Sequence, residues 1–196
     1  MNNIALITGA TSGFGKAIAE RFAAERWNLI LTGRRKDRLD ALEQRLREEF
    51  GIAVITLNFD VRSLEECTTH LAQLSIEWRA IDVLVNNAGL ALGRESFVDG
   101  SVDQWNTMID TNIKGFLYVA KAVLSIMKEQ GSGYIINTGS VAGRNSYVGG
   151  NVYGATKAAV KMLSESMRLE AAAYGVRVGE IAPGAAETEF SMVRFD

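Results

Sequence analysis

A tyrosine and a lysine four residues apart are the strongest chemical signal in this sequence. Tyr153 and Lys157 lie in a segment, 151–174, that has few helix breakers and places apolar residues such as Val160 and Leu169 at helical spacing. Positions i and i+4 share one face of a helix, so both side chains point the same way. A free tyrosine has a pKa of about 10, and a neighbouring ammonium lowers that pKa because it favours the phenolate. The pair is therefore suited to exchange a proton with a carbonyl oxygen or an alcohol near neutral pH.

Ser140 supports a catalytic interpretation of this pair. Alone, the two side chains would more readily be an exposed aromatic ring and a solvated lysine. Ser140, however, ends the run Gly-Tyr-Ile-Ile-Asn-Thr-Gly-Ser, which is typical of a buried strand followed by a loop. Open α/β sheets bind their ligands at the carboxyl ends of parallel strands. We therefore expect the Ser140 hydroxyl to bind the same substrate oxygen as Tyr153.

A glycine-rich turn near the amino terminus has the pattern of a nucleotide site. Residues 3–8 read as a short buried strand, and Gly9-Ala-Thr-Ser-Gly13-Phe-Gly15 then leads into a helix with Ala17 in its apolar stripe. Gly9 permits the tight turn, Gly13 lets the backbone approach a phosphate, and Gly15 allows close packing of helix and strand. The helix amino terminus offers free N–H groups to a pyrophosphate. The spacing differs from the commoner Gly-x-Gly-x-x-Gly, and a plain glycine turn is the alternative.

The end of the next predicted strand, 27–32, indicates which nucleotide is bound. A site for NAD usually has an acidic residue here for the ribose 2′-hydroxyl, but residues 32–36 contain none. Arg34 and Arg35 stand there instead, and guanidinium groups match a 2′-phosphate. The sequence therefore favours NADP over NAD. The alternative is a pair of solvated arginines ahead of a charged helix, most plausibly for Arg35.

Composition limits the other possibilities. The chain has 196 residues, 47% of them hydrophobic, which fits one domain over 1–196. A net charge of −2 gives no case for nucleic acid or an acidic membrane. With Cys67 and His70 as the only cysteine and histidine, a zinc site is not expected, and His70 is expected on a polar helix face. The single cysteine and the lack of a signal peptide or apolar span favour the cytoplasm.

Strand-like and helix-like stretches alternate along the chain. Strands are predicted at 3–8, 27–32, 52–58, 81–86, 133–138 and 176–182. Helices are predicted at 14–25, 36–49, 63–77, 101–110, 112–129 and 152–174. This alternation predicts an α/β fold, a parallel sheet covered by helices on both faces.

Six motifs follow one another in a specific order: Thr8-Gly9-x-x-x-Gly13-x-Gly15, Asn86-Asn87-Ala88-Gly89, Asn112, Ser140, Tyr153-x-x-x-Lys157 and Pro183-Gly184. In this order the chain resembles the classical short-chain dehydrogenase/reductase family over nearly its whole length. The resemblance implies a Rossmann-type doubly wound sheet, NADP as cofactor, and four catalytic residues. Tyr153 would be the acid/base, Lys157 would lower its pKa and bind the nicotinamide ribose, Ser140 would orient the substrate oxygen, and Asn112 would hold a relay water. The implied cofactor-binding residues are Gly9, Thr11, Ser12, Gly13, Phe14, Gly15, Arg34, Arg35, Asp60, Val61, Asn87, Ala88, Gly89, Tyr153, Lys157, Pro183, Gly184 and Thr188.

A narrower resemblance concerns the substrate. Residues 86–93, 149–158 and 188–195 are similar to the NADP-dependent 3-hydroxy acid dehydrogenases, a group that includes serine/allo-threonine dehydrogenases and malonic semialdehyde reductases. A small substrate with an anionic group is implied, which Arg144 or Arg194 could bind, although both could equally be surface residues. A reductase of sulfoacetaldehyde or of a 3-oxoacyl thioester is the alternative enzyme, and a non-catalytic NADP sensor is the alternative of another class.

Two further expectations follow from the resemblance. Family members normally continue beyond the position of Asp196 through a substrate-covering segment, a helix and a last strand, so the sequence is expected to lack the C-terminal portion of its domain. That portion would hold much of the substrate pocket. The family also implies a homotetramer, with the helices near 112–129 and 152–174 packing across a dimer interface.

Overall fold

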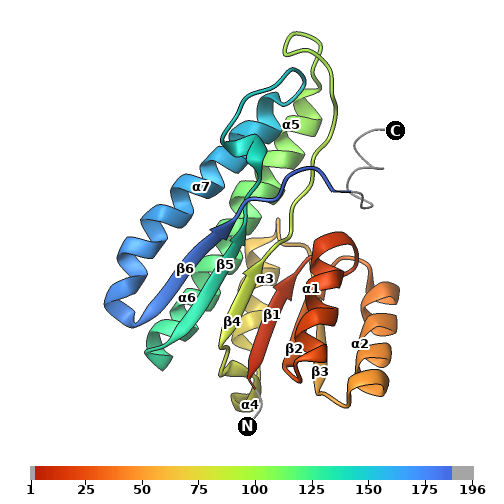
Figure 1. Cartoon of the computed structure of the whole chain (residues 1–196), viewed down its shortest axis with the longest axis vertical. Helices are drawn as coiled ribbons and strands as arrows, with labels where there is room; N and C mark the ends of the chain where they lie inside the picture. The colour runs from red at the N-terminus through yellow and green to blue at the C-terminus, as the bar shows by residue number, and fades with distance from the viewer. Residues whose placement is uncertain (1–2, 187–196) are drawn as a thin grey trace.

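The fold is a six-stranded parallel sheet with helices on both faces (Figure 1). The structure is a computed structural model that describes residues 3–186. The strand order is β3-β2-β1-β4-β5-β6, and every neighbouring pair is parallel. The strands are β1 (Ile4–Thr8), β2 (Asn28–Gly33), β3 (Val54–Asn58), β4 (Val83–Asn86), β5 (Gly133–Thr138) and β6 (Val176–Ile181). The order reverses between β1 and β4, so the doubly wound arrangement predicted from the sequence is confirmed.

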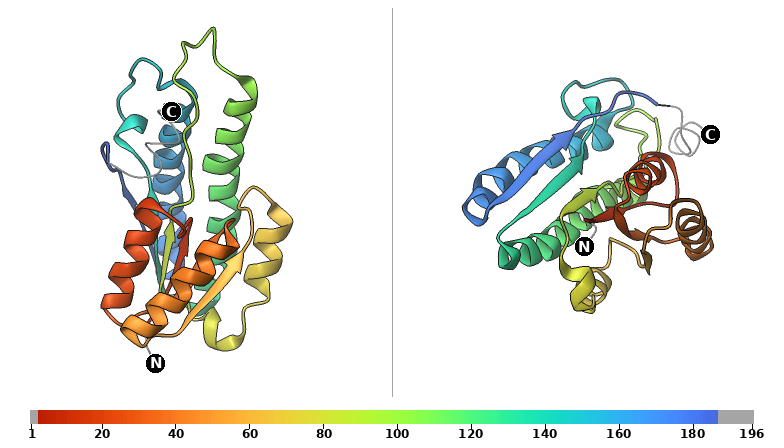
Figure 2. Two further views of the ribbon diagram at one scale, coloured as in Figure 1. Left: turned by 90° about the vertical axis from the view of Figure 1, so that its right-hand side faces the viewer. Right: turned by 60° about the horizontal axis from the view of Figure 1, so that its bottom comes forward.

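The helices form one layer on each face of the sheet (Figure 2). Helices α1 and α2 pack with Ile7 and Leu31 on one face, and helices α3, α6 and α7 pack with Leu6 and Ile30 on the other. Both faces of the central strands are thus buried, because adjacent residues point to opposite sides. The helices are α1 (Gly13–Ala24), α2 (Lys36–Phe50), α3 (Leu64–Ala72), α4 (Ile76–Arg79), α5 (Val102–Ile109), α6 (Phe116–Gln130) and α7 (Asn151–Ala171), with 3-10 turns η2 (Val141–Gly143) and η3 (Ala172–Tyr174).

The helix predicted at 63–77 was wrong, because the chain forms α3 and α4 with a break between them. Leu74 lies in this break and is buried in the core. Ser75 has extended backbone before α4, and its hydroxyl donates to the Glu77 carboxylate over 2.6 Å. A serine that bonds to its own following turn favours a new helix start over a continued helix.

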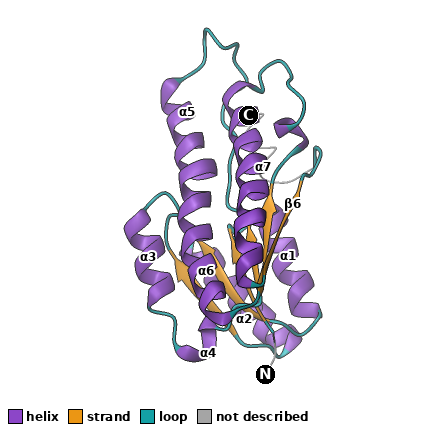
Figure 3. Cartoon of the chain, turned by 90° about the vertical axis from the view of Figure 1, so that its left-hand side faces the viewer, coloured by secondary structure: helices purple, strands orange, loops and turns teal. Residues whose placement is uncertain are grey.

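Helices α5 and α6 were predicted as separate, but a π-helical segment, η1 (Asp110–Gly115), joins them (Figure 3). Such segments are rare and often lie at functional sites. The chain passes close to the segment after β3 here, since a Cβ atom on Gly115 would lie 2.7 Å from Cγ2 of Val61. The prediction separated the helices at residue 111, and the structure instead widens one continuous helical run around Asn112.

Three further details of the sequence interpretation were wrong. On α1 the buried alanines are Ala19 and Ala23, while Ala17 is exposed. On α7 Leu169 is 78% exposed and lies outside the core. The His70 ring is half-buried and stacks on Phe59 with ring centroids 5.3 Å apart, instead of lying on a polar face. Among residues 3–186, no helix has the length and apolar character needed to cross a membrane.

Candidate active site

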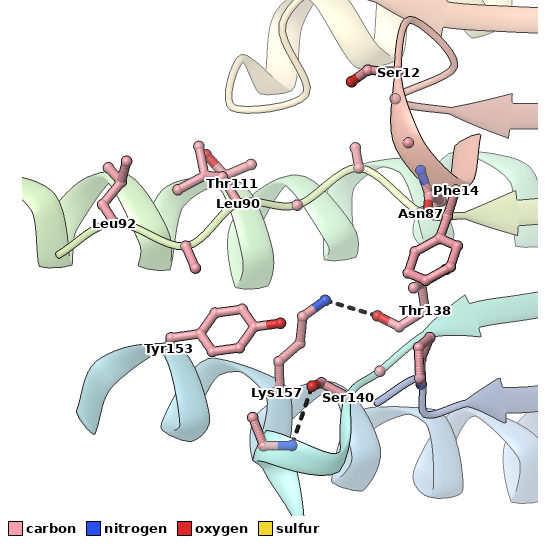
Figure 4. Close-up of a pocket in the computed structure, with 18 of the residues that line it drawn as sticks. Ser12, Phe14, Asn87, Leu90, Leu92, Thr111, Thr138, Ser140, Tyr153 and Lys157 are labelled. Carbon is pink, nitrogen blue, oxygen red and sulfur yellow. Dashed lines mark hydrogen bonds between the residues drawn. The ribbon is translucent and has the colours of Figure 1, made fainter. Parts of the chain in front are cut away.

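The predicted site residues from four parts of the chain meet in one cleft of about 850 Å³ at the carboxyl ends of the strands. Figure 4 shows the close-up, with the glycine-rich turn, the loop after β4, the end of β5 and helix α7 around it. The point at which the strand order reverses lies beneath the cleft, which is where open sheets bind ligands. Among the described residues, no group of His, Cys, Asp or Glu side chains could hold a metal ion.

The glycine-rich turn is packed against the loop after β4 too closely for side chains. Gly9 has a positive φ of 68°, and a Cβ atom on Gly15 would lie 2.7 Å from Nδ2 of Asn87 and 2.8 Å from the carbonyl carbon of Gly9. Asn87 Nδ2 donates to the Thr8 carbonyl over 2.9 Å, and the Thr8 hydroxyl accepts from the main-chain N–H groups of Asn87 and Ala88, each over 2.9 Å. These contacts fix the start of α1 at the edge of the cleft.

Both predicted arginines line the cleft, but their environments differ. Arg35 donates from Nε and Nη2 to the Thr11 hydroxyl over 3.1 and 2.9 Å, and from Nη2 to the Ser12 hydroxyl over 2.9 Å. Arg34 is 57% exposed, and its Nη1 lies 3.8 Å from Oδ2 of Asp60. The alternative of a solvated Arg35 side chain is therefore excluded in this structure, since its guanidinium is held across the glycine-rich turn.

Asp60 and Val61 follow β3 and line the same end of the cleft. The Arg62 guanidinium donates to Oδ2 of Asp60 from Nε over 2.9 Å and from Nη2 over 2.6 Å. Although burial raises the pKa of Asp60, the hydrogen bonds from Arg62 hold the net pKa below its ordinary value. Asp60 is therefore an anionic acceptor at neutral pH and can receive a hydrogen bond from a nucleotide base.

Tyr153 and Lys157 project from α7 into the cleft, as predicted from their spacing. They are 7% and 6% exposed, and the Tyr153 hydroxyl points toward the Lys157 ammonium (Figure 4). Lys157 Nζ donates to the Thr138 carbonyl over 2.8 Å. Burial lowers the pKa of Lys157 to about 8, and the negative charge of Glu180 acts in the opposite direction. The Tyr153 phenol thus stands next to a cation, and a neighbouring positive charge favours the phenolate form of a tyrosine.

Ser140 lies at the end of β5 in the same cleft. Its Oγ accepts from the Ala142 N–H over 3.1 Å and so caps the turn η2, which leaves its own proton available to a ligand. The turn rests directly on α7, because a Cβ atom on Gly143 would lie 2.5 Å from the carbonyl carbon of Lys157. The position of Ser140 is therefore tied to the helix that carries Lys157.

The Asn112 side chain is fully engaged by protein groups. Its Oδ1 accepts from the Leu90 N–H over 2.8 Å, and its Nδ2 donates to the Leu90 carbonyl over 2.8 Å and to the Thr156 hydroxyl over 3.0 Å. Asn112 therefore joins the loop after β4 to α7, and its role in holding a relay water stays a prediction. Gly89 lies beside this junction, since its Cβ position is 3.4 Å from Lys157 Nζ.

Of the predicted site residues near the C-terminal end of the chain, the structure describes only some. Pro183 and Gly184 line the cleft, and the Pro183 carbonyl accepts from the Val141 N–H over 3.1 Å. Thr188 and Arg194 lie outside the described residues. Arg144, a candidate for a substrate anion, instead donates to the Glu180 carboxylate over 2.9 Å and lines a second depression between β6 and α7. That proposed role for Arg144 was wrong, because β6 draws its side chain away from the cleft.

Several lining residues were missed by the sequence interpretation. They carry no motif, and only the fold brings them to the cleft. The missed lining residues include Phe59, Leu90, Leu92, Thr111, Thr138, Asn145, Ser146 and Tyr147. Thr156 does not line the cleft but was also missed as the partner of Asn112, and its place between Tyr153 and Lys157 in the motif was the available signal.

Comparison with known proteins places these features in a family. The chain matches the profile of the short chain dehydrogenase family over residues 3–196. It is 51% identical over 193 residues to the NADP-dependent 3-hydroxy acid dehydrogenase YdfG of Salmonella typhi, covering 98% of this chain and 76% of that protein. It is 48% identical over 195 residues to sulfoacetaldehyde reductase 2 of Chromohalobacter salexigens, covering 99% and 77%. The solved closed form of serine dehydrogenase complexed with NADP+ superposes with a TM-score of 0.91 at 50% identity, covering 98% and 76%.

Proposed function

Because the chain belongs to the short-chain dehydrogenase family, we propose that it is an NADP-dependent oxidoreductase acting on a small 3-hydroxy acid or the corresponding semialdehyde. The observation that carries this proposal is the Tyr153–Lys157 pair, buried in a cleft whose opposite end is formed by a glycine-rich turn and Arg35. A proton donor and a dinucleotide-shaped site in one cleft are what hydride transfer requires. The relatives named for NADP and for 3-hydroxy acids support the same conclusion.

The geometry of the turn fits NADP. Gly9 and Gly13 line the cleft, and neither has a side chain that would cover its backbone there. The Ser12 side chain caps no N–H group of α1, which leaves these donors to the pyrophosphate. Arg35, with Arg34 beside it, would bind the 2′-phosphate. Asp60 and Val61 would contact the adenine, the residues from Asn87 to Gly89 the body of the cofactor, and Pro183, Gly184 and Thr188 its nicotinamide end.

The protein groups around Tyr153 would manage the proton. When bound, NADPH supplies the hydride that reduces the carbonyl carbon of the substrate. Tyr153 gives its hydroxyl proton to the carbonyl oxygen, and the Lys157 ammonium stabilises the phenolate that remains. Ser140 holds the substrate oxygen by a hydrogen bond, and a water near Asn112 returns a proton to the site. In the oxidation direction, the phenolate of Tyr153 takes the proton from the alcohol.

The substrate side of the cleft favours a small molecule. It is bordered by Leu92, Asn145 and Tyr147. Within residues 3–186, the cations that line the cleft are Arg34, Arg35 and Lys157. In this proposal the cofactor or the catalytic tyrosine already uses each of them, so none binds a substrate anion. Arg194, outside the described part of the chain, remains the candidate for that role. Reduction of sulfoacetaldehyde is the second proposal, because relatives of that name are nearly as similar as the hydroxy acid dehydrogenases.

We also propose that the whole chain, residues 1–196, is one domain that assembles into a homotetramer. Helices α6 and α7 present a shared outer surface with small and apolar residues, including Leu117, Ala155, Ala158 and Met162, the last of which is 62% exposed. Measurement of the mass in solution by light scattering tests this, and a monomeric mass would overturn it. Cys67 is a buried free thiol, and a chain with one unpaired cysteine fits the reducing cytoplasm as its location.

The decisive experiment measures turnover by the absorbance of reduced nicotinamide. L-serine, allo-threonine, 3-hydroxyisobutyrate, malonic semialdehyde, sulfoacetaldehyde and a 3-oxoacyl thioester would each be offered with NADP(H) and with NAD(H). Turnover of the hydroxy acids with NADP supports the first proposal, and turnover of sulfoacetaldehyde alone moves the assignment to the second.

The Tyr153→Phe variant separates an enzyme from a non-catalytic NADP sensor. Loss of the hydroxyl removes the proton donor but keeps the ring that packs against Met108 and Ala91. We expect turnover to fall by at least about a hundredfold, with little change in NADPH affinity measured by fluorescence. Unchanged turnover in this variant would contradict the catalytic role of Tyr153.

A further inference from the structure

The carboxylate of Glu180, on β6, lies directly behind the loop that carries Ser140. Its side chain is only 11% exposed, and its register partner on β5 is Asn137. A Cβ atom on Gly139 would lie 2.7 Å from the Glu180 carboxyl carbon. Residue 139 can therefore carry no side chain while Glu180 fills this space. The glycine ahead of Ser140 and the glutamate on the next strand form one packing unit.

The Glu180 carboxylate also fastens the far end of that loop. Its Oε2 accepts from Nη2 of Arg144, the residue that ends the turn η2, over 2.9 Å. Main-chain bonds join the near end of the loop to β6 and the segment after it, from Gly139 to Ile181 over 2.8 Å and from Val141 to Pro183 over 3.1 Å. The Ser140 turn is thus held at its beginning by the backbone and at its end by the Arg144–Glu180 ion pair.

Glu180 has charge left to act on other groups. Within the described residues, its Oε1 is buried without a hydrogen-bond partner. The charged side chains that surround it are Arg144 from η2 and, from α7, Lys157, Lys161, Glu165 and Arg168, while β5 contributes the neutral Asn137. On β6 itself, Arg177 lies over the ring of Tyr134.

Of these groups, Lys157 is the one whose charge the proposed reaction needs. Lys161 already pairs with Glu165 over 2.7 Å, and Arg144 pairs with Glu180 itself. Burial favours the neutral form of Lys157 and lowers its pKa to about 8, although the negative charge of Glu180 acts in the opposite direction. The Lys157 ammonium donates to the carbonyl of Thr138 over 2.8 Å, and the next residue, Gly139, is the one against which the Glu180 carboxylate packs. A carboxylate outside the cleft therefore lies close to the lysine ammonium.

We propose that Glu180 is a positioning residue for the reaction: it holds the Ser140–Arg144 turn against β6 and places a negative charge behind the Lys157 ammonium that stands beside Tyr153. This inference rests on the proposed oxidoreductase function. It concerns a residue that carries no recognisable motif and does not line the cleft. The packing of the Glu180 carboxylate also explains why residue 139 is a glycine, because the φ angle of Gly139 is not in the region that favours glycine.

The first test is the pH profile of the Glu180→Gln variant, which keeps the shape of the side chain and removes its charge. Loss of that charge lowers the pKa of Lys157, so the alkaline limb of kcat/KM should move to lower pH. At the alkaline edge of the wild-type optimum, kcat should fall about threefold to tenfold, the size of effect expected for one coupled neighbour. Glu165→Gln is the matched control. It removes a carboxylate that lines the same depression but is paired with Lys161.

Two results would overturn the electrostatic part of the inference. One is a Glu180→Gln profile that coincides with the wild type, and the other is an equal shift in Glu165→Gln. A purely structural role for Glu180 would lower activity at every pH without moving the limb.

The second test needs no substrate, so it separates this inference from the proposed function. Melting temperatures would be compared for the wild type, Gly139→Ala, Glu180→Ala and the double variant. Because the new Cβ meets the carboxylate, Gly139→Ala alone should be destabilising, and the double variant should melt higher than the sum of the single effects predicts. Strictly additive effects would overturn the positioning part. If the wild type turns over no substrate of the panel, the proposed function and the electrostatic part fail together, and this cycle still decides the contact.

Discussion

Replacing Arg35 tests the proposed preference for NADP most directly. Its guanidinium makes three hydrogen bonds to the hydroxyls of Thr11 and Ser12, at 2.9 to 3.1 Å. These bonds hold the side chain at the rim of the cleft before any phosphate arrives, so less side-chain entropy is lost on binding. The variant Arg35→Leu keeps an apolar stem of similar shape and removes every donor.

The size of the effect follows from the bonds that a 2′-phosphate would form. A hydrogen bond to a charged group contributes about 1.5–3 kcal/mol, and about 1.4 kcal/mol is tenfold in affinity. Arg35→Leu should therefore weaken NADPH binding by about 10- to 150-fold and leave NADH binding nearly unchanged. Arg34→Leu should lose less than about tenfold, because Arg34 is 57% exposed and lies 3.8 Å from Asp60.

The assay is a fluorescence titration of both variants with NADPH and NADH at one fixed ionic strength, followed by KM for each cofactor. Lys36→Leu is the matched control, since Lys36 is an adjacent exposed cation that pairs with Asp40. An equal loss of affinity for NADPH and NADH in Arg35→Leu would refute the reasoning. Arg35 would then act only by supporting the Thr11–Ser12 turn, and the cofactor preference would have another origin.

Two more predictions concern the turn and the catalytic lysine. In Gly15→Ala the new Cβ atom would lie 2.8 Å from the carbonyl carbon of Gly9, so α1 must shift. We expect the free energy of unfolding in urea to fall by about 1–3 kcal/mol and NADPH to bind more weakly. Wild-type values for both measurements would contradict the packing argument. The pKa of Lys157, about 8 against an ordinary 10.5, means that the unfolded chain binds more protons between these pH values. The free energy of unfolding of the cofactor-free wild type should therefore rise relative to that of Lys157→Met as the pH increases from 8 to 10.5. A constant difference between the two free energies across that interval would show that Lys157 is not desolvated.

Local patterns predicted those parts of the site that depend on a single element. Tyr153 and Lys157 share a face because the period of a helix fixes the direction of i and i+4. The glycine-rich turn was recognisable because strand, turn and helix follow one another directly. In both cases the determinants lie within one short segment, so their spacing in the sequence is also their spacing in the structure.

Positions that depend on contacts between elements were not predictable in the same way. Arg144 was an open candidate until β6 placed Glu180 beside it, and only the fold shows that the Asn112 side chain bonds to Leu90 and Thr156. The π-helical segment around Asn112 ends at Gly115, which packs closely against Val61, a residue far from it in the sequence. Each of these outcomes depends on strand order and register, which residue spacing alone does not encode.

The same distinction bears on how the reaction is controlled. The groups that exchange the proton come from a recognisable motif, but their environment comes from elsewhere: Thr138 accepts from Lys157, Gly143 lets η2 rest on α7, and Glu180 adds charge from β6. A buried lysine with a pKa of about 8 is partly deprotonated near neutral pH, so a small change in this surrounding charge alters the fraction that can stabilise the phenolate. Two chains with the same Tyr-x-x-x-Lys motif can therefore differ in pH dependence through residues that never touch the substrate.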